Sequence, residues 1–422
     1  MEFLPKSEFI NVMITRGFLN NCSNLETLDK QLRSKISTAY IGFDATAKSL
    51  HAGHLTQIMM LYWFQKCGHQ PIVLMGGGTT KIGDPSFRQS ERTLISEKEI
   101  EENISSIKKG FSSYINFKEG NNSALLLNNS EWLDKLNYIE MLRSYGSQFT
   151  IGRMLTFDSV KQRLEREQSL SFLEFNYMIL QAIDFLELKK RHNCILQMGG
   201  SDQWGNIVNG IELTRRINRS EVFGLTSNLL TTADGKKMGK TQSGAVWIDP
   251  NMLNSFDFWQ YWRNTDDKDV LKFLKLFTNI DIAECERLGK LIGKELNEAK
   301  IILATEVTRL AHGSVAAENA EKASLELFSE TSEQSDGLPK HFLDLQTGES
   351  SFFLSKILVT IGFSKSNKEA KRLIAENGIK VNDELINQVD YALSKDMLNV
   401  FVKISAGKKR HVLVKNNDIK PH

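Results

Sequence analysis

Pro71-Ile-Val-Leu-Met75, followed at once by Gly76-Gly-Gly78, gives the first indication of how this chain folds. A short apolar run that ends in glycines is typical of a central strand of a parallel sheet, buried on both faces and leading into a loop. Ala39-Tyr-Ile-Gly-Phe43 is a second apolar run, and Cys194-Ile-Leu-Gln-Met198 before Gly199-Gly200 repeats the whole profile. The three stretches predict a parallel sheet whose strands end near a cluster of loops.

Helical stretches separate these strands, and two of them begin with a capping box. In Ser96-Glu-Lys-Glu99 and Ser171-Phe-Leu-Glu174, the serine and the glutamate three residues later can satisfy free backbone N–H groups. Strands that alternate with helices favour a doubly wound parallel sheet. We therefore expect an α/β fold with a doubly wound parallel sheet over residues 1–248. Its ligand site should lie beyond the carboxyl ends of the strands.

The strand pattern disappears between residues 249 and 330. Asp267–Phe277 and Glu295–His312 have the apolar spacing of amphipathic helices, so this region is predicted to be an all-α domain. Residues 331–349 are rich in Ser, Glu and Gly and are expected to contain a linker.

Residues 350–422 predict a small C-terminal α/β domain. Its expected elements are an apolar segment, a basic helix ended by Gly378 and two strands: Phe352–Gly362, Ser366 to about Asn377, Ile379–Val381 and Asn399–Lys403. The segment holds 13 Lys and Arg against 7 Asp and Glu, whereas the rest of the chain holds 40 against 44. A basic domain on a weakly acidic body suggests a polyanion as partner, with a merely solvated basic surface as the alternative.

The composition is that of a globular protein, with 41% hydrophobic and 25% charged residues in 422. No apolar run reaches the ~18–20 residues that span a bilayer, and the N-terminus lacks the pattern of a secretory signal. The four cysteines lie far apart, without metal-ligand spacing. We expect a cytoplasmic protein with reduced thiols, no membrane partner and no metal site of its own.

The motif His51-Ala-Gly-His54 carries part of the predicted chemistry. Histidines spaced i, i+3 project from one face of a helix's first turn, where free N–H groups and the helix dipole already favour phosphate. Gly53 leaves room for a flat base against the backbone, and Thr46 is placed to donate to an outer phosphate. Taken alone, this motif has a substantial chance of being accidental.

The motif Lys237-Met-Gly-Lys240-Thr241 stands about 180 residues later, behind the polar stretch Thr231–Lys236. Its two lysines supply positive charge for a departing pyrophosphate, and its glycines suit a loop that closes over ATP. Alone, it is most simply a solvated turn. The two motifs together, in this order on an α/β pattern, indicate a triphosphate cut between its α- and β-phosphates.

A polar stripe runs along the otherwise apolar helix predicted over Phe175–Leu186. Tyr177, Gln181 and Asp184 are spaced i, i+4, i+7, and an unpaired buried polar group costs roughly 1–3 kcal/mol. The stripe should therefore face an internal polar network or a polar ligand. Further polar groups that suit a small zwitterion lie in other motifs: Tyr40, Asp44, Asp84, Asp202 and Gln203.

These motifs together resemble the bacterial tyrosyl-tRNA synthetase family of class I aminoacyl-tRNA synthetases, over nearly the whole chain. The motifs are Tyr40-x-Gly42-x-Asp44-x-Thr46, His51-x-Gly-His54, Gly83-Asp84-Pro85, Tyr177-x-x-x-Gln181-x-x-Asp184, Gly199-Gly-Ser-Asp202-Gln203-Trp-Gly-Asn206 and Lys237-Met-Gly-Lys240-Thr241. The resemblance also identifies residues 1–248 with a Rossmann-like catalytic domain that has an inserted connective segment. It identifies residues 249–330 with an anticodon-side helical domain and residues 350–422 with a ribosomal-protein-like RNA-binding domain.

The resemblance implies a role for each matched position. Tyr40 and Asp184 would contact the phenol of the tyrosine substrate. Asp84, Tyr177 and Gln181 would contact its ammonium group, and Gln203 its carboxylate. ATP would be bound by Gly42, Asp44, Gly53, Gly200, Asp202 and Lys240. The transition state would be stabilised by Thr46, His51, His54, Lys237, Lys240 and Thr241, with Arg88 and Arg92 at the pyrophosphate. The tRNA would contact Lys365, Lys368, Lys371, Arg372, Lys408, Lys409 and Arg410.

The implied reaction joins tyrosine to ATP, giving tyrosyl-adenylate and pyrophosphate, and then transfers the tyrosyl group to the 3′-terminal adenosine of tRNA(Tyr). Magnesium would arrive on the ATP phosphates, the enzyme would be a homodimer, and no editing domain is expected. The departures are small: Ala52 and Gln57 are unusual, and Gly239 and Thr241 replace the usual serines. Three alternatives remain: a tryptophan-specific sister enzyme, a small-molecule nucleotidyltransferase, and a non-catalytic RNA-binding protein built on a synthetase.

Overall fold

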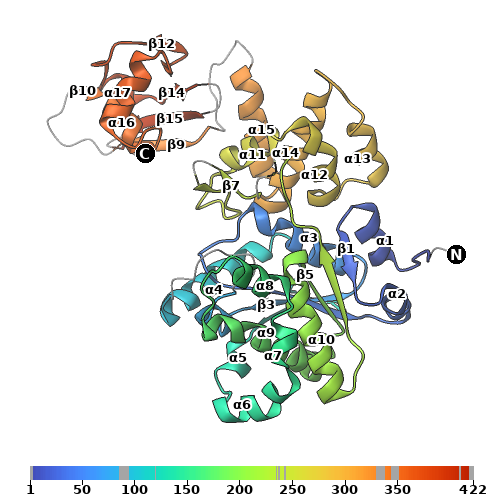
Figure 1. Ribbon diagram of the computed structural model, residues 1–422. Coiled ribbons are helices and arrows are strands. Elements are labelled where there is room, and N and C mark those ends of the chain that lie inside the picture. The colour runs from blue at the N-terminus through green and yellow to red at the C-terminus, as the bar shows by residue number, and fades with distance from the viewer. Residues whose placement is uncertain are drawn as a thin grey trace. The chain divides into compact units, whose positions relative to one another are not determined.

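The structure is a computed structural model that describes residues 3–84, 95–118, 120–233, 235, 238–241, 244–328, 338–343, 351–407 and 410–417. Two compact units can be distinguished (Figure 1). Unit 1 comprises Met1–Leu253 and Tyr261–Gly313, and unit 2 comprises Asn254–Gln260 and Ser314–His422. No helix in the described part of the chain is long and apolar enough to cross a membrane.

Unit 1 is built on a six-stranded sheet of order β1-β6-β5-β2-β3-β4. All neighbouring strands are parallel except the edge pair β1–β6. The strands are β1 (Leu19–Cys22), β2 (Thr38–Phe43), β3 (Gln70–Met75), β4 (Leu125–Asn128), β5 (Leu196–Gly200) and β6 (Phe223–Ser227). The predicted α/β fold with a doubly wound parallel sheet is thereby confirmed.

Helices cover both faces of this sheet (Figure 1). On one face α3 (Leu55–Lys66) packs on β2, β3 and β5, and on the other α9 (Phe172–His192) packs against α10 (Trp204–Asn218), which lies on β5 and β6. The remaining helices of the sheet domain are α1 (Glu8–Thr15), α2 (Leu25–Ser34), α4 (Glu97–Phe111), α5 (Ser130–Leu133), α6 (Tyr138–Ser144), α7 (Ile151–Met154) and α8 (Asp158–Glu165).

The capping signals in the sequence mark helix starts correctly. Ser96 caps α4 by accepting the Glu99 N–H, and Ser171 and Glu174 form a full reciprocal capping box on α9. That box fixes the start of a 21-residue helix whose apolar side joins the core with Met178, Ile183 and Phe185. Because α9 crosses beneath the sheet's carboxyl edge, its polar stripe is carried to the site described below.

The predicted helical region is confirmed, since α-helices account for most of Ser255–Phe328. Unit 1 contains α12 (Val270–Phe277), α13 (Ile282–Leu288) and α14 (Leu296–His312). The helix α11 (Ser255–Arg263) is shared between the units, and α15 (Ser314–Phe328) belongs to unit 2. Short strands β7 (Lys240–Thr241) and β8 (Gly244–Ala245) pair just before this region. The domain boundaries at residues 248 and 330 stay a prediction.

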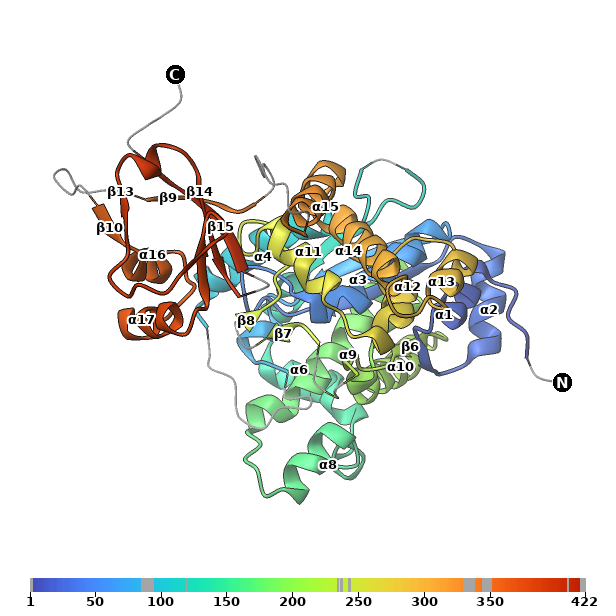
Figure 2. The ribbon, with the colours of Figure 1, turned by 90° about the horizontal axis from the view of Figure 1, so that it is seen from above.

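Unit 2 holds a five-stranded sheet of order β12-β11-β14-β15-β9 and a separate β10–β13 pair. Figure 2 shows α16 (Leu354–Thr360) and α17 (Asn367–Ala375) on one side of this sheet. Its core includes Leu354, Ile374, Ile404 and Val414. The strands are β9 (Lys340–Leu343), β10 (Ser351–Phe353), β11 (Ile379–Val381), β12 (Glu384–Ile386), β13 (Ala392–Ser394), β14 (Val402–Ala406) and β15 (Arg410–Asn416).

Three details of unit 2 differ from the sequence-based expectation. Asn377, not Gly378, adopts the left-handed conformation that ends α17, with φ +57°. Gly378 is needed for a different reason, because a Cβ there would lie 2.9 Å from the Leu373 carbonyl oxygen. The strand expected over Asn399–Lys403 begins later, at Val402, and Lys340–Leu343 within the expected linker forms β9.

Candidate active site

A cavity of about 490 Å³ with convergent polar groups lies at the carboxyl ends of β2, β3 and β5. The order of the strands reverses between β2 and β5, and ligands of doubly wound sheets bind at such a point. Fourteen of the residues chosen from the sequence line this cavity: Tyr40, Gly42, Asp44, Thr46, His51, Gly53, His54, Asp84, Tyr177, Gln181, Asp184, Gly200, Asp202 and Gln203.

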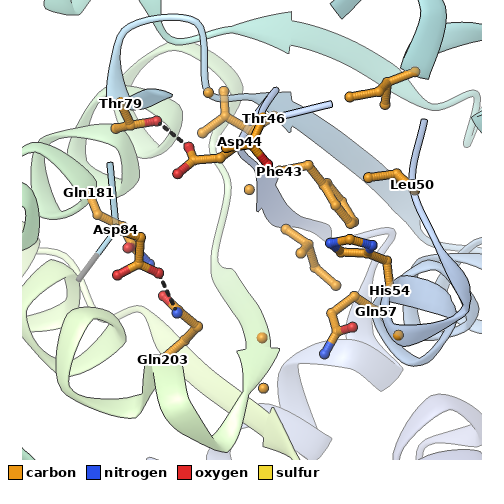
Figure 3. Close-up of a pocket in the computed structure, with 18 of the residues that line it drawn as sticks. Phe43, Asp44, Thr46, Leu50, His54, Gln57, Thr79, Asp84, Gln181 and Gln203 are labelled. Carbon is orange, nitrogen blue, oxygen red and sulfur yellow. Dashed lines mark hydrogen bonds between the residues drawn. The ribbon is translucent and has the colours of Figure 1, made fainter. Parts of the chain in front are cut away.

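Figure 3 shows how these side chains face the cavity. Asp84, Gln181 and Gln203 lie on one side, and His54 and Gln57 lie on the other. The Gln203 amide Nε2 donates to Oδ2 of Asp84 at 2.8 Å, which ties two of the predicted amino-acid contacts together. The cavity therefore has one end rich in carboxylates and amides and another that contains imidazoles.

Asp184 and Tyr40 line the cavity and are both buried, and this part of the lining is called its closed end. The Asp184 carboxylate accepts a hydrogen bond from Trp132 Nε1 at 2.8 Å and another from Asn129 Nδ2 at 3.0 Å. Burial raises the pKa of Asp184 to about 7, although these two hydrogen bonds act in the opposite direction. The carboxylate is thus held in a fixed orientation with its charge only partly compensated.

The hydroxyl of Tyr40 is the second polar group at this closed end. It is buried and has no hydrogen-bond partner among the described residues. Burial also raises the pKa of Tyr40 well above its usual value, with Asp184 as the next contribution, so the phenol stays protonated. A buried hydroxyl without a partner costs free energy unless a ligand completes it.

Two further residues that line the cavity carry buried acceptor atoms without a hydrogen-bond partner. The side-chain oxygens of Gln181 and Gln197 lack hydrogen-bond partners in the described part of the chain. Gln181 comes from α9 and Gln197 from β5, so neither lies in an irregular surface loop. Acceptors of this kind suit a ligand that carries N–H or O–H donors.

Asp44 joins the residues around Asp184 to Tyr177 by hydrogen bonds. Its carboxylate accepts one hydrogen bond from Thr79 Oγ1 at 2.8 Å and one from the Tyr177 hydroxyl at 3.2 Å. Thr79 in turn accepts from Asn129 Nδ2 at 3.0 Å. A continuous chain of hydrogen bonds therefore runs from Asp184 through Asn129 and Thr79 to Asp44 and Tyr177.

Both histidines have a defined tautomer. Nδ1 of His51 accepts the Gly53 N–H at 3.1 Å, and Nδ1 of His54 accepts the His51 N–H at 3.2 Å. Burial, with His51 as a second contribution, lowers the pKa of His54 to about 3, so this ring is neutral at physiological pH. Since Nδ1 acts as acceptor in each ring, each neutral imidazole carries its proton on Nε2.

We call His51–His54 the first signature motif and Lys237–Thr241 the second. The backbone of the second packs directly on that of the first. A Cβ on Gly53 would lie 2.8 Å from His51 Cε1 and 3.0 Å from the carbonyl oxygen of Met238. A Cβ on Gly239 would lie 2.6 Å from the Gly53 backbone nitrogen, and Gly239 also has φ +93°. Glycine is required at both positions because the two backbones touch.

Some predicted residues lie beyond what can be described. Arg88, Arg92, Lys237, Lys408 and Lys409 lie outside the described residues. For Lys240 and Thr241 only the backbone, in β7, is described. Among the described residues no group of three or more His, Cys, Asp and Glu side chains is arranged to hold a metal ion.

Sequence reasoning missed four residues of this site: Thr79, Asn129, Trp132 and Gln197. Thr79 and Asn129 follow the carboxyl ends of β3 and β4, the position where polar residues of such sheets serve ligands. That rule would have found Asn129 if Leu125–Asn128 had been recognised as a strand. Nothing in the sequence pattern marked Trp132 or Gln197.

Comparison with known proteins agrees with this geometry. Residues 33–329 match the family described as tRNA synthetases class I (W and Y), and residues 330–414 match the tyrosine--tRNA ligase SYY-like C-terminal domain. The chain is 57% identical to the tyrosine--tRNA ligase of Ruegeria pomeroyi, over 98% of this chain and 99% of the relative. It is 56% identical to that of Roseobacter denitrificans, with the same coverage.

A solved structure also resembles the chain. The C-terminally truncated mitochondrial tyrosyl-tRNA synthetase of Aspergillus nidulans is 31% identical, with a TM-score of 0.69, over 76% of this chain and 94% of that one. The family match covers most of the chain, and the relatives above 50% identity extend along nearly all of it. The chain therefore belongs to the tyrosine--tRNA ligase family of class I aminoacyl-tRNA synthetases.

Proposed function

We propose that the cavity binds tyrosine and ATP side by side, forms tyrosyl-adenylate, and then passes the tyrosyl group to tRNA(Tyr). The observation that carries this proposal is the closed end of the cavity, where the unpaired Tyr40 hydroxyl and the oriented Asp184 carboxylate lie together. A phenol O–H can donate to the carboxylate and accept from Tyr40 O–H, so one hydroxyl would satisfy both groups.

The amino-acid backbone would occupy the middle of the cavity. Asp84, the Tyr177 hydroxyl and the unpaired Gln181 oxygen are acceptors for an ammonium group. Gln203 carries an amide N–H for the substrate carboxylate, although in the free protein this group donates to Asp84. Binding would therefore exchange one hydrogen bond for another rather than uncover a buried group.

ATP would occupy the end that holds the imidazoles. Asp202 and Gly200 would contact the ribose, and a Cβ on Gly200 would come within 2.3 Å of the Asp202 carboxylate, so a larger residue there would displace that carboxylate. Gly42, Asp44 and Gly53 line the same space. The Nε2–H groups of His51 and His54, with Thr46, would donate to the phosphate oxygens as charge builds on the α-phosphate.

The pyrophosphate would be met by Lys237, Lys240, Thr241, Arg88 and Arg92. This part rests on their place in the sequence motifs and on the packing of Met238 and Gly239 against Gly53. Magnesium would come with the ATP phosphates and neutralise part of their charge. The protein's contribution to both steps is positioning and electrostatic stabilisation.

Unit 2 would bind the tRNA. Four basic residues are exposed on α17 or just before it: Lys365, Lys368, Lys371 and Arg372. Arg410 begins β15. Lys371 and Arg372 have only loose ion-pair contacts of 3.7 Å, to Asp390 and Glu376, so phosphates can compete for them.

A second copy of the chain would cover the inserted segment of the sheet domain. Large apolar side chains are exposed on α6, α7 and the start of α9: Tyr138, Ile139, Ile151, Leu155, Phe172 and Leu173. Exposed apolar groups gathered in one segment are typical of an interface between subunits. Light scattering should give the mass of a dimer, and Phe172→Asp should shift it toward the monomer. We also propose that the protein acts in the cytoplasm.

Pyrophosphate exchange with single amino acids tests the function. ATP should become labelled from pyrophosphate with tyrosine and at least about 100-fold more slowly with tryptophan or phenylalanine. The relatives that match over the whole chain are tyrosine--tRNA ligases, which favours tyrosine over tryptophan and over a small nucleotidyltransferase. The proposal would be overturned if only tryptophan supported exchange, or if none of the amino acids did.

A further inference from the structure

The carboxylate of Asp269 accepts a hydrogen bond from a distant segment of the chain rather than from its own helix. It occupies the N-cap of α12 and is only 5% exposed, but its side chain makes no capping hydrogen bond with its own helix. Instead Oδ2 accepts the backbone N–H of Ala233 at 2.7 Å, across 36 residues of sequence. Asp266 caps this helical stretch instead by accepting the Lys268 N–H, so the buried carboxylate of Asp269 serves the other segment, which indicates that the position of that segment matters.

Lys272 holds the same segment from the same helix face. It follows Asp269 by three residues, and its Nζ donates to the carbonyl oxygen of Thr231 at 2.9 Å. Asp269 therefore takes an N–H and Lys272 takes a C=O from two residues that are nearly adjacent. This segment, Thr231–Ala233, leads into the second signature motif.

Backbone hydrogen bonds tie Gly239, inside the second signature motif, to the first one. The Gly239 carbonyl accepts the Val246 N–H at 3.0 Å, and the Val246 carbonyl accepts the Ala52 N–H at 2.8 Å. The contact at Gly239 is thereby continued to the first signature, beside His51.

We propose that Asp269 and Lys272 are positioning residues of the helical region that set the register of the second signature motif against the first. Neither of the two lines the cavity, so they act through the backbone of Thr231 and Ala233. Their effect should fall on the step in which charge develops on the phosphates, because that step uses the signature residues. Tyrosine binding, which uses α9 and β2, should be unaffected.

This inference rests on the proposed function for its kinetic readout but not for its structural one. Hydrogen–deuterium exchange at the Ala233 amide should speed up in Asp269→Ala whether or not the enzyme accepts tyrosine, because the 2.7 Å hydrogen bond is lost. If exchange in the peptide that contains Ala233 is unchanged, the positioning contact is absent and the inference fails. If the wild-type protein forms no tyrosyl-adenylate but exchange at Ala233 speeds up in Asp269→Ala, the proposed function fails and the positioning contact stands.

The kinetic test uses single-turnover formation of tyrosyl-adenylate by the full-length chain. Asp269→Ala should lower the rate constant about tenfold, since a hydrogen bond to a charged group is lost, and Lys272→Ala should lower it several-fold. The double variant should lose less than the product of the two, because both residues hold one segment. Asp269→Asn, which keeps an acceptor oxygen, should recover most of the rate.

Lys268→Ala is the matched control. Lys268 directly precedes Asp269 but is exposed. Its ammonium makes no hydrogen bond or ion pair among the described residues. Its rate constant should equal wild type within twofold, and the tyrosine Kd should stay within twofold in every variant. A tyrosine Kd that rises in step with the loss of rate would show a general structural defect and would overturn the positioning role.

Discussion

The Trp132 indole donates a 2.8 Å hydrogen bond to Oδ1 of Asp184, so an aromatic side chain from α5 fixes the carboxylate that α9 presents to the cavity. Asn129 donates to the other oxygen at 3.0 Å. Both partners are donors that cannot accept from a ligand at these atoms, which leaves the remaining lone pairs of Asp184 for an incoming O–H. We therefore expect a ligand hydroxyl to donate to Asp184 at the closed end of the site.

Asp184→Asn should reduce discrimination between tyrosine and phenylalanine. The amide keeps the size of the side chain but replaces one acceptor with a donor, at a cost of roughly 1.5–3 kcal/mol in the tyrosine complex. We expect the ratio of kcat/KM values for the two amino acids in pyrophosphate exchange to fall at least tenfold. Asp134→Asn, at an exposed ion pair with Lys81, is the control and should leave the ratio unchanged.

Tyrosine affinity should depend on pH between 6 and 8 because of Asp184. Its pKa is raised to about 7 in the free protein, so the carboxylate is mostly protonated at pH 6 and mostly ionised at pH 8. The ionised form is the better acceptor for the phenol, and the tyrosine Kd should thus rise several-fold as pH falls from 8 to 6. Fluorescence titration measures this. A Kd that is equally pH-dependent in Asp184→Asn would contradict the assignment.

Gly53→Ala should slow the chemical step with little effect on tyrosine binding. The added Cβ would lie within 3.0 Å of both the His51 ring and the Met238 carbonyl, so the two signature motifs would have to separate. We expect at least a 100-fold fall in the rate constant for adenylate formation, comparable to the loss of a donor to the transition state. Gly110→Ala, where a Cβ meets nothing within 4 Å, serves as the control. Equal rates for the two variants would show that the motifs do not need this close contact.

Lys368→Ala in α17 should weaken tRNA binding without changing tyrosine activation. Removal of one phosphate contact should lower affinity across all tRNA sequences and reduce the slope of log Kd against log salt by about 1. Filter binding at several salt concentrations measures the slope. Lys118→Ala, an exposed lysine of unit 1, should change neither quantity, and a similar loss in that variant would point to nonspecific charge instead.

The residues of the candidate site were predictable where a motif names them, and the network around them was not. His51, His54, Tyr177, Gln181 and Asp184 stand at helical spacings that can be read from the chain. Asn129 and Trp132 reach Asp184 only because β4 and α5 bring a segment some 50 residues away against α9. Such contacts depend on the three-dimensional fold rather than on any local pattern.

The end of α17 shows the same limit at the level of the backbone. A glycine after a basic helix predicts a left-handed terminator, yet Asn377 adopts that conformation one residue earlier. Asparagine tolerates the left-handed region, so the two choices have similar local free energies. With Asn377 in that conformation, the Gly378 N–H donates to the Leu373 carbonyl oxygen at 2.9 Å, a contact that is visible only in the folded structure.

The crystal structure of the chain with tyrosine bound tests the central claim most directly. The account predicts the phenol oxygen at hydrogen-bond distance, roughly 2.6–3.2 Å, from both the Asp184 carboxylate and the Tyr40 hydroxyl. It also predicts the substrate ammonium among Asp84, Tyr177 and Gln181. A tyrosine bound with its ring elsewhere, or with Tyr40 and Asp184 still without a ligand contact, would contradict it.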